Sequence, residues 1–372
     1  MADADWARQS GLVSTPRSCA RTEIAQSTLF RRRLRIDVVR GVVLLALSVL
    51  ATVACAGSEG LETKTAAPIA FVHGDGTIYL VKADGSGRHK LPMRRHRYIS
   101  SVAWSPDARR IAYDSNEGIL VVNVDGGVVR SLSRTGFELR PAWSPDGREI
   151  AFDQNEDGYS SIWVVRTGGG HARRLTPGIE FGGPVWSPDG RTMLLIHRYN
   201  GLYSIKVRAN SPRRLVPVIG GRQALAEWKF GDSSTTVAWS PNGKQIAFLT
   251  RTELWVMKAD GTGRRVLLQG PDRTNRDIAW SPDGRRLAMA RHDGDWEIFV
   301  VNLDGGGTRE LTHNQRADDR DPSWSPDGRA IAFTSDRDGN TEIYVMNGDG
   351  SAQRNISRSP GDDHSPVWGP KG

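Results

Sequence analysis

A repeated tetrapeptide constrains the fold of this chain more than any other feature. Six tryptophans each begin the sequence Trp-Ser-Pro-Asp or Trp-Ser-Pro-Asn, and a seventh begins the shortened copy Trp-Gly-Pro-Lys-Gly. They are Trp104, Trp143, Trp186, Trp239, Trp280, Trp324 and Trp368. Successive tryptophans lie 39, 43, 53, 41, 44 and 44 residues apart. A period of this length is typical of propellers and solenoids, in which each repeat is one supersecondary unit.

Each repeat contains four short apolar runs that are bounded by Gly, Asp, Asn and Pro. In the last complete repeat these runs are 322–324, 331–333, 343–346 and 354–357. β-Branched and aromatic residues between such turn residues predict strands, and no segment of the repeats has the period of a helix. The Ser-Pro-Asp-Gly and Asp-Gly sequences between the runs predict tight hairpins. We therefore expect each repeat to form a four-stranded antiparallel blade of a β-propeller.

The order of the runs predicts the number of blades. The chain enters the repeats at a second strand, 69–71, and leaves them at a first strand that ends in Trp368. Six complete blades lie between Trp104 and Ser357, and the strands left over at the two ends would make a seventh. The sequence thus predicts an all-β, seven-bladed propeller over residues 69–371, closed by the C-terminal strand. Six blades are the alternative.

Composition and charge exclude several classes of protein. Cys19 and Cys55 are the only cysteines, which excludes a disulfide framework, a cysteine zinc site or a cysteine nucleophile in the repeats. The net charge of +8 comes half from the first 55 residues, and the charges of the repeats are nearly balanced, so we expect no nucleic acid as a partner. The chain has no Gly-x-Ser-x-Gly nucleophile elbow, which excludes a peptidase of the α/β-hydrolase type.

Residues 1–56 predict an export signal or a membrane anchor. Arginines at 31–33, 35 and 40 precede the apolar run 41–56, which has 16 residues and is shorter than the roughly 20 that span a bilayer. Three alternatives remain open: lipidation of Cys55, cleavage after Ala56, and retention as an uncleaved anchor. Each of them places the rest of the chain outside the cytoplasm, after a linker at 57–68.

The pattern Trp-Ser-Pro-Asp-Gly, Ile-Ala-Phe, Ile-Tyr-Val resembles the WD40-like repeat of the TolB-type propeller family, over about 69–371. The resemblance implies an exported propeller in the periplasm or at the cell surface that serves as an envelope scaffold. A separate α/β domain can precede this kind of propeller. Because only the linker 57–68 precedes the repeats here, we expect that domain to be missing.

The repeat also resembles that of the seven-bladed oligogalacturonate lyases, in which channel histidines surround a metal. A carbohydrate-binding or carbohydrate-active propeller is therefore the alternative function. The histidines that would correspond to that site are His197, His292, His313 and His364.

The two ends of the blades differ in sequence. The hairpins between the first and second and between the third and fourth strands are uniform, whereas the other loops and the blade-to-blade crossovers vary. Variable loops on a rigid scaffold are where function is usually carried, so we predict that a partner binds at the mouth of the central channel. The candidate residues are Arg94, Arg95, Arg97, Tyr98, Arg140, Trp228, Phe230, Arg276, Asp318, Asp319, Asp321, Asp362, Asp363 and His364, with Phe137, Phe181, Asp277 and Arg320 in the same loops.

Other conspicuous residues are assigned to structure. One tryptophan per blade at a constant position predicts packing between neighbouring blades, and the Asp-Gly pairs predict turns. The acidic stretches 336–342 and 293–297 lack the spacing of a calcium loop. We expect no metal and no cofactor, and a monomeric, non-enzymatic protein whose partner is an envelope protein or peptide.

Overall fold

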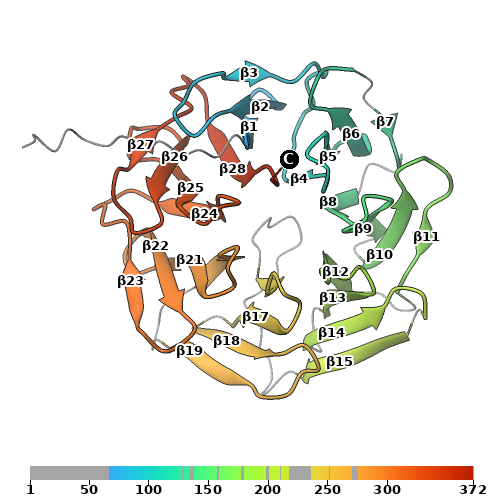
Figure 1. Cartoon of the computed structure of the whole chain (residues 1–372). Coiled ribbons are helices and arrows are strands. Elements are labelled where there is room, and N and C mark those ends of the chain that lie inside the picture. Colours follow the sequence, from blue (N-terminus) through green and yellow to red (C-terminus); the bar gives the residue numbers. More distant parts are fainter. Residues whose placement is uncertain are drawn as a thin grey trace, which may run out of the picture. The chain divides into compact units, whose positions relative to one another are not determined.

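The computed structural model describes residues 67–371, apart from 128–129, 134–137, 157–158, 177–179, 198–200, 210, 218–235, 251 and 270–274. The described chain forms seven antiparallel sheets of four strands each, which are arranged in a ring (Figure 1). The predicted all-β, seven-bladed propeller is therefore confirmed. None of the described residues forms a helix that is long and apolar enough to cross a membrane.

Each blade runs from an inner strand at the channel to an outer strand at the rim. The inner strands are β4 (Val102–Trp104), β8 (Glu138–Trp143), β12 (Phe181–Trp186), β16 (Val237–Trp239), β20 (Asn275–Trp280), β24 (Asp319–Trp324) and β28 (Asp363–Trp368). The second strands are β5 (Arg110–Ser115), β9 (Glu149–Glu156), β13 (Thr192–His197), β17 (Gln245–Leu249), β21 (Arg286–His292), β25 (Ala330–Ser335) and β1 (Ile69–His73). In this order the blades are numbered 1 to 7.

The third and outer strands complete each blade. The third strands, again for blades 1 to 7, are β6 (Gly118–Asn123), β10 (Tyr159–Arg166), β14 (Gly201–Lys206), β18 (Glu253–Lys258), β22 (Trp296–Asn302), β26 (Glu342–Asn347) and β2 (Thr77–Val81). The outer strands are β7 (Arg130–Ser131), β11 (Arg173–Arg174), β15 (Ser211–Pro217), β19 (Arg265–Gln269), β23 (Thr308–Glu310), β27 (Arg354–Asn355) and β3 (His89–Lys90).

The last strand of the chain closes the ring. Strand β28 pairs antiparallel with β1, with Trp368 opposite Ile69, and so supplies the inner strand of blade 7. The amide of Gly369 then donates to the carbonyl of Pro68 at 2.8 Å. Joining the two ends in one sheet pairs the inner edge of β1, which confirms the predicted closure.

The Trp-Ser-Pro-Asp-Gly sequence forms the hairpin between the inner and second strands. In blade 2 the hydroxyl of Ser144 donates to Asp146 Oδ1 at 2.6 Å and accepts the amide of Glu149 at 2.9 Å. Asp146 Oδ1 also accepts the amide of Arg148, and Gly147 takes a φ of +67° that favours glycine. The serine and aspartate therefore satisfy the turn's own backbone, and the repeated aspartates are turn residues as predicted.

The tryptophan that ends each inner strand packs between two blades. Six of the seven tryptophans are between 5% and 9% exposed. The indole Nε1 of Trp143 donates to the carbonyl of Ala103 in blade 1, at 3.0 Å. Trp186 and Trp280 make the same bond to the blade before them, and Trp104 makes it to blade 7. The prediction that these residues serve packing is confirmed.

An alanine in the second strand leaves room for the tryptophan of the following blade. Ala112 shares a core with Trp143, and Ala247 shares one with Trp280. Blade 3 has Leu194 at this position, in the core that includes Trp239 of blade 4. Trp239 is only half-buried, and its Nε1 has no hydrogen-bond partner among the described residues. The one blade with a residue larger than alanine at this position thus contacts the only one of the seven repeated tryptophans that is not fully buried.

Replacing the alanine in another blade tests this packing rule. Ala247→Leu adds three carbon atoms against Trp280, and overpacking of this kind costs about 1–3 kcal/mol. We expect the free energy of unfolding, measured by urea denaturation, to fall by this amount. The same change at the exposed Ala209 should stay within about 0.5 kcal/mol of the unchanged protein. Equal stabilities for the two variants would contradict the rule.

Candidate functional site

The channel is lined by the residue three positions before each tryptophan, here called the ring position. The seven ring residues are Ser101, Arg140, Gly183, Thr236, Asp277, Asp321 and Ser365. Five inner strands carry a bulge at this point. The ring residues of those strands have φ between +54° and +63°. A bulge redirects a side chain out of the sheet, and here it turns the ring residue into the channel.

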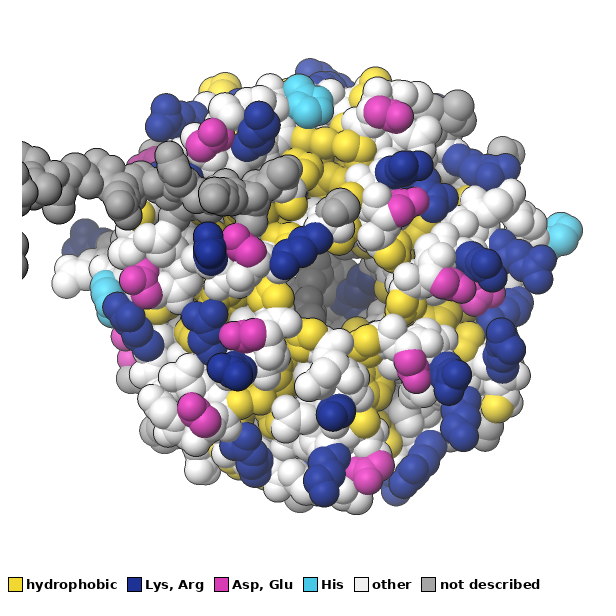
Figure 2. Space-filling model, in the orientation of Figure 1, with side chains coloured by type: hydrophobic (Ala, Val, Ile, Leu, Met, Phe, Trp, Pro, Cys, Tyr) yellow, Lys and Arg dark blue, Asp and Glu magenta, His cyan; other side chains and the backbone are white. Residues whose placement is uncertain are grey.

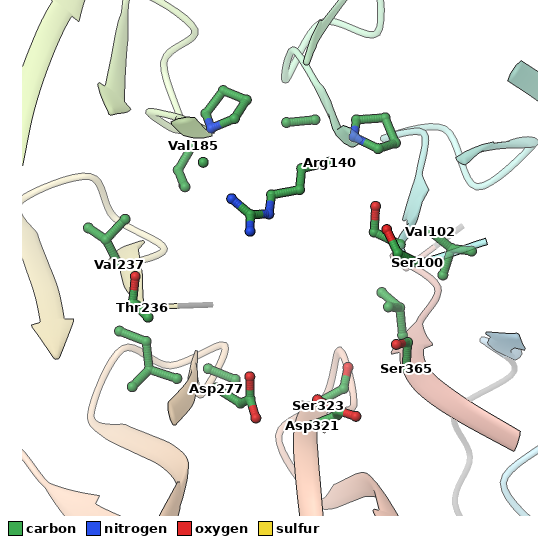
Figure 3. Close-up of a pocket in the computed structure, with 18 of the residues that line it drawn as sticks. Ser100, Val102, Arg140, Val185, Thr236, Val237, Asp277, Asp321, Ser323 and Ser365 are labelled. Atoms are coloured by element: carbon green, nitrogen blue, oxygen red, sulfur yellow. The ribbon is translucent and has the colours of Figure 1, made fainter. Parts of the chain in front are cut away.

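The ring side chains surround a cavity of about 350 Å³ inside the inner strands. Figure 3 shows the guanidinium of Arg140 extending toward its middle, with Asp277 and Asp321 on the opposite side and Thr236 and Ser365 between them. The tryptophan is the same in all seven blades, whereas the ring position changes its chemistry from blade to blade. Packing alone therefore does not determine these side chains.

Buried aspartates of the second strands hold the ring in blades 1 to 3. Asp114 accepts the amides of Ser101 at 2.9 Å and of Arg140 in the next blade at 3.2 Å. Asp153 pairs with Arg140 Nη1 at 3.3 Å and accepts the amide of Gly183 in the next blade. Burial raises the pKa of Asp153 to about 6, although the Arg140 guanidinium opposes this shift. These aspartates fix the bulged backbone across the blade boundary.

The basic segment before blade 1 lies exposed on the mouth face, the side of the variable loops. Arg94 forms an ion pair with Glu117, and Arg95 forms one with Asp75 at 3.2 Å. The amide of Arg97 donates to an asparagine side chain at 3.2 Å. Tyr98 is 41% exposed. The structure thus places all four predicted residues at the surface, with the charges of Arg94 and Arg95 partly compensated.

A second group of predicted residues gathers around Trp296 at the start of β22. The guanidinium of Arg276 lies 5.3 Å from the Trp296 ring centre, and that of Arg320 lies 5.6 Å from it. Arg276 also pairs with Asp277 at 2.6 Å, and Arg320 pairs with Asp318. This arrangement presents an aromatic ring with two arginines and two carboxylates beside the channel.

Two predicted residues have a different role from the one expected. Asp319 and Asp363 are fully buried. Asp319 accepts two hydrogen bonds from Arg337, at 2.8 and 3.0 Å, and Asp363 lies 2.6 Å from His73 Nδ1. Because these carboxylates point into the blades, they support the mouth and do not present charge to a partner. Their burial differs from the exposure that a direct contact with a partner requires.

The remaining predicted residues divide between surface and channel. Asp362 is exposed and accepts the amide of Thr341 at 3.0 Å. His364 is half-buried beside the ring. Burial lowers the pKa of its imidazole, although the nearby carboxylates of Asp321 and Asp362 act to raise it. Trp228 and Phe230, the lipidation candidate Cys55, and Phe137 lie outside the described residues.

The four histidines of the alternative function are distributed over several blades. His197 packs edge-on against Phe181, and His292 packs against Trp296. His313 is exposed and lies 3.4 Å from Glu310. In the described part of the chain, no group of three or more His, Cys, Asp or Glu side chains is placed to hold a metal ion.

Sequence reasoning missed Ser101, Thr236, Ser365 and Trp296 as residues of the site. The first three share the ring position with Arg140 and Asp321, so a count back from each tryptophan would have found them. The bulge that turns this position inward is a tertiary feature, and it has no separate sequence signal. Trp296 opens a third strand and was hidden among apolar strand residues.

A buried glutamate beneath the mouth, Glu297, should make the stability of the fold depend on pH. Burial, with Asp319 nearby, raises the pKa of Glu297 to about 7 from its ordinary 4.5. Between these values the folded chain keeps a proton that the unfolded chain has lost, so stability falls as pH rises from 5 to 7 and then levels off. Glu297→Gln has no such proton, and we expect a smaller fall in the free energy of unfolding between pH 5 and 7.5.

The control for this experiment is Glu310→Gln, because the Glu310 side chain is 40% exposed. It should reproduce the pH dependence of the unchanged protein in urea unfolding at each pH. If Glu297→Gln also reproduces it, the raised pKa of Glu297 is wrong.

Comparison with known proteins agrees with this geometry. The family described as TolB beta propeller domain matches residues 61–216 and 221–372. No curated protein sequence matches the chain. The fold is similar to that of TolB from Acinetobacter baumannii, at 19% identity and a TM-score of 0.52, over 81% of this chain and 82% of that one.

Two enzymes share the fold at still lower identity. An oligogalacturonate lyase in complex with manganese is 15% identical, with a TM-score of 0.54, over 79% of this chain and 85% of that one. A puromycin hydrolase is 13% identical, with a TM-score of 0.60, over 78% of this chain and 52% of that one. Identities this low establish the fold alone. The family match covers most of the sequence and every blade, and the chain belongs to the TolB β-propeller domain family.

Proposed function

We propose that this chain is an exported, lipid-anchored propeller that binds a protein or peptide at its channel mouth and acts as a non-enzymatic envelope scaffold. The observation that carries the proposal is the ring position. Its residues differ from blade to blade although every inner strand ends in the same tryptophan, all of them line one cavity, and bulges turn five of them inward. Variation at one channel-lining position of a constant scaffold is expected for recognition.

The chemistry of the mouth suits a polypeptide. Arg140 faces Asp277 and Asp321 across the cavity, so the site offers charges of both signs and hydroxyl groups between them. Beside it, Trp296 offers a flat apolar surface, and tryptophan and arginine are enriched among residues that dominate binding energy. A peptide carries backbone donors, acceptors and side-chain charges that match this mixture.

Export is supported by the sequence before the propeller. The arginines at 31–40 and the apolar run at 41–56 have the order of a secretory signal, and Cys55 stands where a lipid would be attached. Membership in the TolB propeller family favours a location outside the cytoplasm.

A second candidate function is binding of an acidic carbohydrate. Trp296, between Arg276 and Arg320, would stack on a sugar ring while the guanidinium groups bind its carboxylates. Saturable binding of an oligogalacturonate that Trp296→Ala abolishes would favour this candidate over a polypeptide.

Reversing two mouth charges tests the proposed surface. The double variant carries Asp318→Lys and Asp321→Lys. Both residues lie at the channel rim, and the buried Asp319 is left unchanged. A partner isolated from the envelope fraction with the full chain as bait should bind this variant at least about tenfold more weakly. The reason is that the new lysines repel the positive groups of the partner that the aspartates attract. Affinity is measured by titration, together with the melting curve.

The matched control is Asp260→Lys, on the uniform hairpins at the opposite side of the blades. Asp260 is exposed and bonds only within its own turn, to Thr262. This variant should bind the partner normally. Loss of binding in the Asp260 variant, with binding kept in the double variant, would show that the wrong face has been assigned.

Lipid anchoring is tested separately at Cys55. Cys55→Ser removes the thiol that would carry the lipid, so the protein should leave the membrane fraction or accumulate as an unprocessed form. Fractionation and the mass of the mature chain measure both effects. Unchanged membrane attachment and unchanged mass in Cys55→Ser would exclude lipidation.

A further inference from the structure

The uniform hairpins lie together on one side of the blades, here called the turn face, and they carry a ring of basic side chains. The residue five positions after each inner-strand tryptophan is basic and exposed in six blades: Arg109, Arg148, Arg191, Lys244, Arg285 and Arg329. The hairpins use only the backbone of this residue: the amide of Arg148 donates to Asp146, and its carbonyl accepts the amide of Thr167. The positive side chains are therefore not required by the hairpin. Figure 2 looks onto this face.

The basic residues are densest between blades 2 and 3. A groove of about 1640 Å³ there is lined by Arg148, Arg166, Arg173, Arg191, Lys206 and Arg208. All six are exposed. Figure 2 shows dark blue side chains along the edge that carries β11 and β15 in Figure 1. The acids in the groove are fewer, and two of them, Asp146 and Asp189, bond to their own turns.

The pairing of charges differs between the mouth face and this groove. On the mouth face, arginines such as Arg95, Arg276 and Arg320 each pair with a carboxylate. In the groove, Arg173 lies 3.7 Å from Glu149, whereas the other five basic side chains have no ion pair within the part of the chain that is described. The groove therefore keeps uncompensated positive charge, although the repeats as a whole are nearly balanced.

The path of the chain connects this face to the apolar segment. Strand β1 begins at Ile69, beside Gly369 at the turn-face end of blade 7. Only residues 57–68 separate it from the run 41–56, and twelve residues reach at most about 40 Å. Any membrane attachment at 41–56 is thus tethered within about 40 Å of the turn-face end of β1.

We propose that the turn face docks on the anionic phospholipid surface of the membrane to which the N-terminal segment attaches, with the groove between blades 2 and 3 as its main contact. This inference rests on the proposed membrane attachment. Guanidinium groups bind phosphate oxygens with charge-assisted hydrogen bonds, and an anionic membrane attracts nearby basic residues. Docking in this way directs the channel mouth away from the bilayer, where it is open to a partner.

The experiment compares the full chain in nanodiscs of pure phosphatidylcholine and in nanodiscs with about 30% phosphatidylglycerol. Amide hydrogen exchange reports which segments are covered. We expect exchange in the hairpins 145–149 and 188–192 to slow by about tenfold in the anionic discs, and exchange in the mouth segment 93–98 to be equal in both. Salt at about 1 M, where the screening length is about 3 Å, should abolish the difference.

Two charge-matched variants decide the contact surface. The groove variant should lose the protection of the hairpins; it carries Arg148→Glu, Arg191→Glu and Arg208→Glu. The mouth variant reverses the same number of charges on the mouth face and should keep the protection; it carries Arg94→Glu, Arg95→Glu and Arg97→Glu. The melting curve of each variant establishes that it is folded.

Several results would overturn the proposal. They are equal exchange in the two kinds of disc, protection of the mouth instead of the hairpins, and loss of protection in the mouth variant. Protection by inorganic phosphate alone in phosphatidylcholine discs would show a site for free phosphate and not a lipid surface. If the chain does not enter discs at all, the proposed anchoring fails instead, so the two failures are distinguishable.

Discussion

The contact between the tryptophan of one blade and the alanine of the blade before it organises this propeller. Each inner strand ends in a tryptophan that lies in the core shared with the second strand of the preceding blade. In four blades the indole Nε1 donates to a carbonyl of the preceding inner strand. Trp104 makes this bond to Val367, which lies in blade 7, where the ring closes. Each contact joins neighbouring blades. Six of them, together with the Leu194 contact to Trp239, make a ring that β28 makes continuous.

The rigid ring allows the positions around the channel to vary. Ser144 and Asp146 satisfy the turn, and Trp143 and Ala112 fill the core, so neither the turn nor the core determines the residue type at position 140. The bulge and the buried Asp114 hold its backbone in place. The same separation occurs on the turn face, where the hairpins need the backbone of Arg148 but not its charge. Both candidate surfaces of the molecule consist of such positions.

The fold could be predicted from the sequence almost completely, because the repeat places every tryptophan and hairpin at the same point of each blade. The candidate site could be predicted only in part. Arg140 and Asp321 were found at the mouth, but the burial of Asp319 depends on Arg337, 18 residues away. Likewise Asp363 is buried against His73, which pairs with it only after the ring closes. Long-range partners of this kind have no local sequence signal, so exposure could not be assigned.

The central claim is that the channel mouth binds the partner, and site-specific photocrosslinking tests it most directly. A photoreactive residue placed at the uncharged ring residues Ser101, Thr236 or Ser365 should crosslink the partner in intact cells. The same residue at Thr262, Asp304 or Ser351, which lie exposed on the turn face, should not. Crosslinks from the turn-face positions alone would contradict the account, because the partner would then occupy the side assigned to the membrane.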